Sequence, residues 1–246
     1  MRPRIAIPVP HSGDPDYASR SLPQYESAVE KAGGEPVPIP LDKTPEEVMK
    51  LIEQCDAVLL PGSRADVDPA KYDAPRNPHT AASDPGRDTV DELLLQDAYN
   101  MKKPVLGICY GMQMLNVYRT GTLVQHIESK INHEAGRKVA LAHTVVVEPA
   151  SKLAEILGAS HKVPVNSSHH QSADVVGDGL RTVARCPEDD IIEAVEGTSP
   201  DHFVLAVQWH PERSFDDDKP SKAIFRALVQ AARAWHVQLT EKLKSV

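Results

Sequence analysis

Three residues in two short motifs have the types that amide-bond hydrolysis requires. Cys109 is the centre of the run GICYG at 107–111, in which glycines stand two residues before and two after the cysteine. A sharp turn from a buried strand into a helix needs such glycines, because the backbone passes close to its neighbours. The N-terminus of that helix would favour the thiolate, the nucleophilic form of the cysteine. The pentad alone is equally compatible with a buried structural cysteine.

A second motif supplies a candidate base and its orienting group. His210 and Glu212 lie in the run WHPE at 209–212, directly after the apolar run 203–207. Pro211 favours an extended residue before it, and alternate residues of an extended segment project to the same side, so Glu212 can reach His210. A lone His-Pro-Glu is more often a surface turn. Combined with Cys109 it predicts a triad in which His210 transfers the proton and Glu212 holds the imidazole.

Acyl transfer also requires hydrogen-bond donors for the oxyanion that forms on the attacked carbonyl. The backbone amide of Tyr110, directly after the cysteine, is one candidate. The other lies in the run LPGS at 60–63, where Gly62 follows an apolar run. The carboxyl ends of parallel strands meet at one edge of a sheet, so we expect these segments to converge on Cys109.

The elements that must position these residues follow an alternating pattern. Short apolar runs alternate with amphipathic stretches, which is typical of a mostly parallel sheet covered by helices. Strands are predicted at 4–9, 36–39, 56–60, 104–108, 144–148, 162–165, 180–184, 191–194 and 203–207. Helices are predicted at 21–32, 45–54, 88–101 and 221–243, and directly after the cysteine. We expect one domain over 1–246, with a polar loop at 61–85 that is long enough to be functional.

Composition excludes several classes of protein. The chain has 246 residues, 41% of them apolar and 25% charged, with a net charge of −8, as in a globular protein without a basic nucleic-acid surface. No apolar run is long enough for a membrane helix, and the short run 5–9 is interrupted by proline and makes a poor signal peptide. The three cysteines lack C-x-x-C spacing, which argues against disulfides and favours a cytoplasmic location.

Taken together, the runs GICYGMQ at 107–113 and WHPE at 209–212 resemble the class I glutamine amidotransferase superfamily. The resemblance implies a flavodoxin-like three-layer α/β sandwich. The run at 60–63, with Asp68, Pro69 and Tyr72 and then VNSSHHQ at 165–171, is most similar to the γ-glutamyl-γ-aminobutyrate hydrolase family. That likeness implies a cofactor-free hydrolase that cleaves a small γ-glutamyl amine through a thioester and releases glutamate. It implies a small-molecule substrate and no nucleic-acid or membrane partner, and it is compatible with a homodimer.

The resemblance also implies which residues hold the substrate. The expected oxyanion and substrate-binding residues are Gly62, Ser63, Tyr110, Gln113, Asn166, Ser167, Ser168 and His169. Tyr110 and His170 depart from the residues common in relatives, which leaves the amine half of the substrate open. Two alternatives remain, a glutaminase subunit that delivers ammonia to a synthase and a catalytically silent binding protein on the same fold.

The eleven histidines raise the question of a metal site. His133, His143, His169 and His170 are the candidates, but they lack a recognised ligand spacing such as H-E-x-x-H. Structural histidines are the better expectation, and we predict that no metal is bound. Cys55 and Cys186 are expected to be chemically inert, because no histidine lies near them in the sequence.

Overall fold

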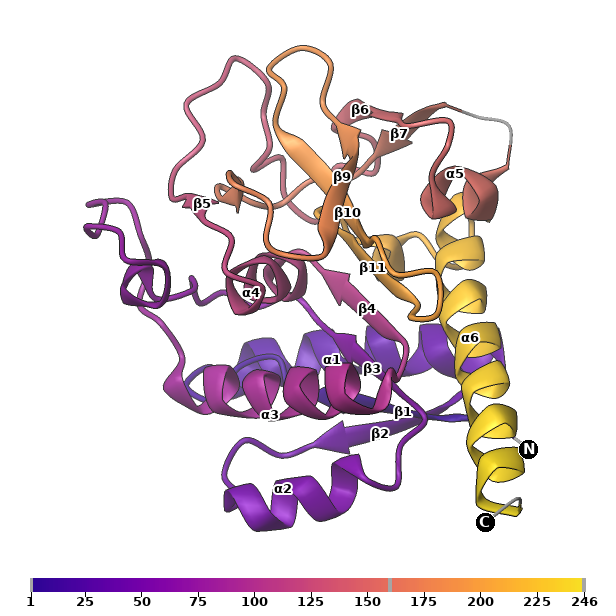
Figure 1. The fold of residues 1–246 in the computed structure, drawn as a ribbon. Coiled ribbons are helices and arrows are strands. Elements are labelled where there is room, and N and C mark those ends of the chain that lie inside the picture. Colours follow the sequence, from indigo (N-terminus) through magenta and orange to yellow (C-terminus); the bar gives the residue numbers. More distant parts are fainter. Residues whose placement is uncertain (1, 159–160, 245–246) are drawn as a thin grey trace.

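A nine-stranded sheet forms the centre of the computed structural model, which describes residues 2–158 and 161–244 (Figure 1). The strand order is β2-β1-β3-β4-β11-β10-β9-β6-β7. The parallel half contains β2 (Glu35–Ile39), β1 (Arg4–Pro8), β3 (Ala57–Leu60), β4 (Val105–Ile108) and β11 (Val204–Val207). The antiparallel half contains β10 (Ile192–Gly197), β9 (Leu180–Arg185), β6 (His143–Val147) and β7 (Lys162–Val165).

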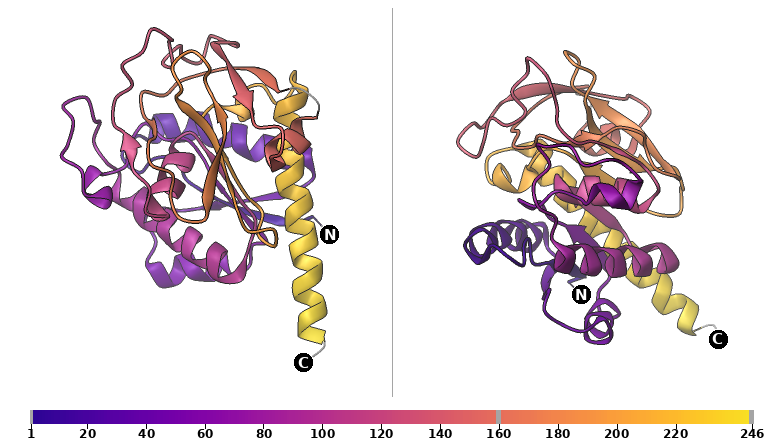
Figure 2. Two further views of the ribbon diagram at one scale, coloured as in Figure 1. Left: turned by 45° about the horizontal axis from the view of Figure 1, so that its top comes forward. Right: turned by 90° about the vertical axis from the view of Figure 1, so that its left-hand side faces the viewer.

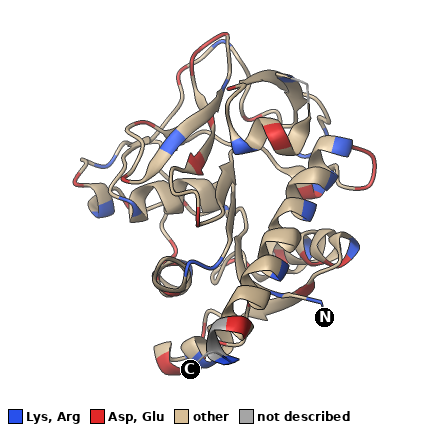
Figure 3. Ribbon diagram, turned by 45° about the vertical axis from the view of Figure 1, so that its right-hand side comes forward, with Lys and Arg blue, Asp and Glu red and all other residues tan. Residues whose placement is uncertain are grey.

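Helices cover both faces of this sheet (Figure 2). One face packs against α1 (Pro15–Ala32), α5 (Lys152–Leu157) and α6 (Lys219–Lys244). The other face packs against α2 (Pro45–Ile52), α3 (Pro85–Met101) and α4 (Tyr110–Tyr118). Each face has its own cluster of fully buried aliphatic side chains, so the predicted α/β class with a three-layer arrangement is confirmed. Basic and acidic residues are interspersed over the elements in the view of Figure 3.

Several element boundaries differ from the prediction for local reasons. Helix α1 begins at Pro15 rather than at 21, because the Asp14 side chain accepts a hydrogen bond from the Tyr17 amide and Pro15 occupies the first turn. The short helix α5 does not follow from the sequence pattern; the Ser151 hydroxyl caps it. The strands β5 (Leu123–Val124) and β8 (Ser172–Ala173), which pair only with each other, also escape prediction because two residues carry no periodic pattern.

The 61–85 segment is more ordered than a plain loop. It contains a 3₁₀ turn, η1 (Pro69–Tyr72), which the Asp68 side chain caps. It ends at Asp84, whose carboxylate accepts hydrogen bonds from the Arg87 amide and from the amide and hydroxyl of Ser12. The C-terminal end of the segment is therefore fixed to the start of α3 and to the loop that follows β1. Among the helices described here, none combines the length and apolar character needed to cross a membrane.

Candidate active site

The chain makes a strained turn at Cys109, between the end of β4 and the start of α4. Cys109 has φ 53° and ψ −107°, a conformation that non-glycine residues rarely adopt. Its amide donates to the Val207 carbonyl at 2.9 Å, and its carbonyl accepts from the Met112 amide at 3.0 Å. These bonds and the packing of β4 against β11 hold the sulfur at the carboxyl edge of the sheet.

The two flanking glycines are required by close approach of the backbone. A Cβ on Gly111 would lie 2.2 Å from the Leu60 carbonyl oxygen, and a Cβ on Gly107 would lie 2.8 Å from the Gly111 carbonyl oxygen. No side chain at either position fits without moving β3 or α4. The turn at Cys109, called the elbow below, therefore packs closely against the end of β3.

His210 and Glu212 form a buried pair. The His210 Nδ1 lies 2.8 Å from the Glu212 Oε1, and both side chains are 3% exposed. Asn166 fixes the His210 backbone from both sides, since its Oδ1 accepts from the His210 amide and its Nδ2 donates to the His210 carbonyl, each at 2.9 Å. The expected extended segment is instead a 3₁₀ turn over Pro211–Arg213, and the turn brings the carboxylate back to the ring. The Glu212 carboxylate accepts the Nδ1 proton, which leaves the Nε2 lone pair as the free base.

Gly62 lies between the cysteine and the histidine. A Cβ built on it would be 3.0 Å from the His210 Cε1 and 3.6 Å from the Cys109 Cβ. The His210 Nε2 is buried and has no hydrogen-bond partner among the described residues, so a reacting group can occupy the space beside it. The ends of β3, β4 and β11 therefore meet around one point.

The amide of Gly62 is already engaged in this structure. It donates to the hydroxyl of Tyr25, from α1, at 3.0 Å. Burial raises the pKa of Tyr25 well above its usual value, so the hydroxyl is neutral and can accept this bond. A carbonyl oxygen that used this amide would have to displace the phenol. The Tyr110 amide, by contrast, acts on the Cys109 sulfur, where it lowers the pKa of the thiol against the larger effect of burial.

Burial sets the protonation states of Cys109 and His210. It raises the pKa of the Cys109 thiol to about 12, outweighing the Arg213 charge and the Tyr110 amide, which favour the thiolate. Burial also lowers the pKa of His210 despite the Glu212 carboxylate. The resting site therefore holds a thiol and a neutral imidazole, not the thiolate that the helix N-terminus alone suggested. Attack by sulfur then requires His210 as a base.

Two adjoining cavities open at this edge of the sheet. The smaller, of about 150 Å³, contains Cys109 and Gln113 together with the carboxylates of Asp66 and Glu134. The larger, of about 500 Å³, contains His210. Ser63, Arg64 and Ser168 line both cavities, and the reacting groups thus lie where the two meet.

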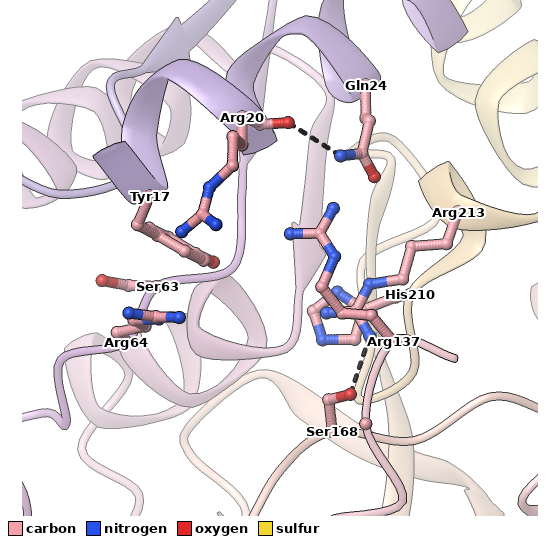
Figure 4. Close-up of a pocket in the computed structure, with 10 residues that line it drawn as sticks. Tyr17, Arg20, Gln24, Ser63, Arg64, Arg137, Ser168, His210 and Arg213 are labelled. Atoms are coloured by element: carbon pink, nitrogen blue, oxygen red, sulfur yellow. Dashed lines mark hydrogen bonds between the residues drawn. The ribbon is translucent and has the colours of Figure 1, made fainter. Parts of the chain in front are cut away.

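Four arginines give the larger cavity a strongly positive wall. They are Arg20, Arg64, Arg137 and Arg213. Figure 4 shows Arg20 and Arg64 on the side of Tyr17, and Arg137 and Arg213 beside His210. Arg64 pairs with Asp14 at 3.0 Å and Arg213 donates to the Ser168 hydroxyl at 2.7 Å. Within residues 2–158 and 161–244, neither Arg20 nor Arg137 forms an ion pair, so both charges are available to a ligand.

The other residues expected in the site divide into two groups. Gln113 and His169 line the smaller cavity, with Ser63, Tyr110 and Ser168. Asn166 and Ser167 line neither cavity: Asn166 holds the His210 backbone, and the Ser167 hydroxyl donates to the His133 carbonyl at 2.6 Å.

The two departures from the family pattern have different surroundings. The Tyr110 side chain is buried, its hydroxyl donates to Asp88, and its ring lies under the Arg87 guanidinium. His170 lines the smaller cavity and lies 3.0 Å from the Asp66 carboxylate.

Several residues of the site gave no signal in the sequence. Arg20 and Tyr25 lie within an ordinary amphipathic helix, and Glu134 and Arg137 lie in the irregular segment 125–142. Only Arg213 had a cue, since it directly follows the triad motif. The remaining residues reach the site through tertiary structure alone.

Comparison with known proteins agrees with this geometry. The family model of peptidase C26 matches residues 9–212. The chain is 41% identical to a provisionally assigned glutamine amidotransferase of Mycobacterium tuberculosis, covering 89% of this chain and 70% of that protein. It is 31% identical to the gamma-glutamyl-gamma-aminobutyrate hydrolase PuuD of Escherichia coli, covering 88% of each.

A structural neighbour supports the fold. It is a provisionally assigned GMP synthase subunit of Thermoplasma acidophilum, with a TM-score of 0.68, 13% identity and 98% coverage of both chains. The family model and the relatives in sequence confirm the resemblance noted in the sequence. The chain belongs to the peptidase C26 family, whose class I glutamine amidotransferase-like members act on amide bonds.

Proposed function

We propose that this protein is a cysteine hydrolase that cleaves the γ-glutamyl amide bond of a small γ-glutamyl amine and releases glutamate. The observation that carries the proposal is the convergence on Gly62, which a Cβ would bring to 3.0 Å from the His210 ring and 3.6 Å from the Cys109 Cβ. Nucleophile, base and orienting carboxylate are then Cys109, His210 and Glu212.

The chemistry proceeds in two steps. The Cys109 sulfur attacks the γ-carbonyl carbon while its proton passes to the His210 Nε2, and the Tyr110 amide stabilises the resulting oxyanion. Collapse breaks the C–N bond, and the imidazolium returns the proton to the departing amine. Water then attacks the thioester, His210 accepts its proton, and the proton returns to the sulfur as glutamate leaves. Glu212 keeps the Nε2 free to accept a proton in both steps.

The two cavities match the two halves of such a substrate. The glutamyl half carries an ammonium and a carboxylate, and the smaller cavity offers the Glu134 carboxylate and the Arg64 guanidinium to them. The amine half would extend past His210 into the cavity with the four arginines. We infer that the amine half carries an anionic group, because Arg20 and Arg137 would otherwise remain as uncompensated charges in one cavity.

The substrate assignment can be tested with a matched pair of compounds. One is a γ-glutamyl amide whose amine half ends in a carboxylate, and the other is the methyl ester of that carboxylate. We expect the acid to give a kcat/KM about tenfold higher, the effect of one charge-assisted hydrogen bond, and to exceed glutamine as substrate. Preference for glutamine, or silence until a synthase is added, would favour an amidotransferase subunit. Binding without turnover would favour a silent binding protein.

Removal of Arg20 and Arg137, the two arginines without an ion pair, should weaken binding of the amine half of the substrate and leave the glutamyl half unaffected. In the double variant Arg20→Ala and Arg137→Ala, we expect KM for the acid to rise about tenfold or more, with kcat changed much less, because the charges bind a part of the substrate remote from the carbonyl. The methyl ester should be almost unaffected. The matched control is Arg226→Ala, an arginine of α6 that lines neither cavity. An equal loss for acid and ester would contradict a role in recognising charge.

A further inference from the structure

Four buried side chains outside the triad converge on one point. They are His133, His143, His169 and Glu193, and their nitrogen and oxygen atoms lie within 4.8 Å of one another. The side chains are 2%, 3%, 1% and 0% exposed, respectively. They come from four separate places in the fold: segment 125–142, the start of β6, the segment after β7, and the start of β10.

The atoms that face the centre lack hydrogen bonds. The His133 Nδ1, His143 Nε2 and His169 Nε2 have no hydrogen-bond partner among the described residues, and neither do the two carboxylate oxygens of Glu193. The Glu193 Oε1 lies within ion-pair distance of all three nitrogens, an arrangement that is favourable only with a cation at the centre or a proton on an imidazole.

The opposite ring nitrogens show where the protons are. The His133 Nε2 lies 2.8 Å from the Asp189 Oδ2, and the His169 Nδ1 lies 2.9 Å from the Gln171 carbonyl oxygen. Carboxylate and carbonyl oxygens only accept hydrogen bonds, so these nitrogens carry the protons. In the neutral rings the nitrogens that face Glu193 then carry lone pairs, directed at a carboxylate oxygen. Metal-binding histidines are oriented in this way, with the outer N–H held by a carboxylate or a carbonyl.

Three of the six spacings among the inner atoms match the edges of a tetrahedral metal site, and the other three are within 4.8 Å. The Glu193 Oε1 lies 3.2 Å from the His133 Nδ1, 3.4 Å from the His143 Nε2 and 3.5 Å from the His169 Nε2. Four ligands at the zinc bond length of about 2.0–2.1 Å form a tetrahedron with edges of roughly 3.3 Å. The three distances thus agree with a shell into which an ion fits with small adjustments.

We propose that this cluster binds one divalent transition-metal ion of the zinc class, held by three imidazole nitrogens and one carboxylate oxygen. Imidazole ligands select against calcium and magnesium, which prefer oxygen ligands. The proposal goes beyond the proposed function and reverses the expectation from the sequence that no metal is bound. Sequence spacing could not show the site because its ligands belong to four elements.

A neighbouring set of groups fits an ion less well. His133, Cys186 and Asp189 also lie close together, but they offer only three ligands. The Cys186 thiol donates to the Glu188 carboxylate at 3.2 Å, and Asp189 already accepts hydrogen bonds from His133 and Ser129. The ion therefore belongs on the Glu193 side of the His133 ring, with Asp189 as the partner that orients the ring.

The position of the cluster assigns the ion a positioning role. Four protein ligands and near-complete burial leave no open coordination site for substrate. The ion would join segment 125–142 to the segment after β7 and to β10, beside the bonds from the His169 amide to the His133 carbonyl at 2.9 Å and from the Gly136 amide to the Ser167 carbonyl at 3.0 Å. These segments contribute Gly136, Arg137 and Ser168 to the lining of the larger cavity, the one with the four arginines. The ion would thus stabilise one wall of that cavity.

The test uses the full chain purified without a histidine tag. We expect elemental analysis to find about one zinc per chain, in protein as isolated or after supply of Zn²⁺. Removal of the ion by a chelator should lower Tm by several degrees, and Zn²⁺ should restore it. Loading the metal-free chain with Co²⁺ should give the visible absorption of a tetrahedral site. Because the ion supports the cavity wall, its removal should raise KM more than it lowers kcat.

Variants of the cluster test whether these four side chains are the ligands. Glu193→Gln preserves the shape of the side chain, and His143→Gln offers a second variant if the first does not fold; both should lose the ion and the Co²⁺ spectrum. His236→Ala, which removes a histidine of α6 bonded to Asp56, should retain both. The proposal is overturned if the folded wild-type chain binds no stoichiometric Zn²⁺, or if both cluster variants bind it as wild type does. These outcomes are independent of which amide the enzyme cleaves.

Discussion

Replacement of Cys109 by alanine is expected to lower the rate of γ-glutamyl amide hydrolysis at least about 10³-fold, because it removes the thiol that we propose as the nucleophile. The fold should persist, since alanine fits wherever the cysteine Cβ fits. Initial rates of glutamate release and a thermal unfolding curve measure the two effects separately.

Cys55→Ala is the matched control for this variant. Cys55 is also buried, and burial raises the pKa of its thiol to about 11. It contacts the α2 side of the sheet, with its thiol donating to the Leu51 carbonyl at 3.3 Å, and its loss should leave turnover unchanged. Turnover retained in Cys109→Ala, or lost in Cys55→Ala, would show that the nucleophile has been misassigned.

The second large effect concerns the backbone next to the nucleophile. Gly111→Ala should destabilise the protein by about 3 kcal/mol or more, or prevent folding, because the new Cβ would lie 2.2 Å from the Leu60 carbonyl oxygen. That oxygen belongs to β3, which pairs with both β1 and β4, so it cannot move away cheaply. The free energy of unfolding in urea, or the soluble yield, measures the loss.

Gly86→Ala provides the comparison. Gly86 lies in the first turn of α3, and the nearest atoms to a Cβ there, from Asp84 and Ser12, would be 3.5 Å away, an ordinary contact distance. We expect the free energy of unfolding of that variant to lie within about 0.5 kcal/mol of the wild-type value. Equal stability of the two variants would mean that the elbow does not pack against β3 as closely as the structure indicates.

The sequence carried enough information to predict the fold and the residues proposed as the triad. The cysteine and its flanking glycines are contiguous, and His210 and Glu212 are two positions apart. Each motif is therefore complete within a few residues, and the ends of parallel strands bring such motifs to one edge of a sheet. For the same reason the alternation of strands and helices predicted the α/β class.

The remaining features depend on distant contacts and could not be predicted in this way. Arg20 lies on a helix whose pattern explains only its buried face, and Arg137 lies in a segment without periodicity. Glu193 is a fully buried residue of β10, where an alternating strand pattern would predict an apolar residue. The raised pKa of the Cys109 thiol follows from burial in the folded chain, which a short motif does not predict.

The strand order places the proposed attacking groups and part of the cavity wall in different halves of the sheet. The proposed attacking groups stand at the ends of β4 and β11, while segment 125–142 and the segment after β7, which supply much of the wall beside them, belong to the antiparallel extension. Gly136 and Arg137 line the cavity of His210 without bonding to the proposed attacking groups, whereas Asn166, after β7, holds the His210 backbone and cannot change freely. In evolutionary terms, segment 125–142 is where the proposed substrate preference can diversify while the proposed triad stays the same.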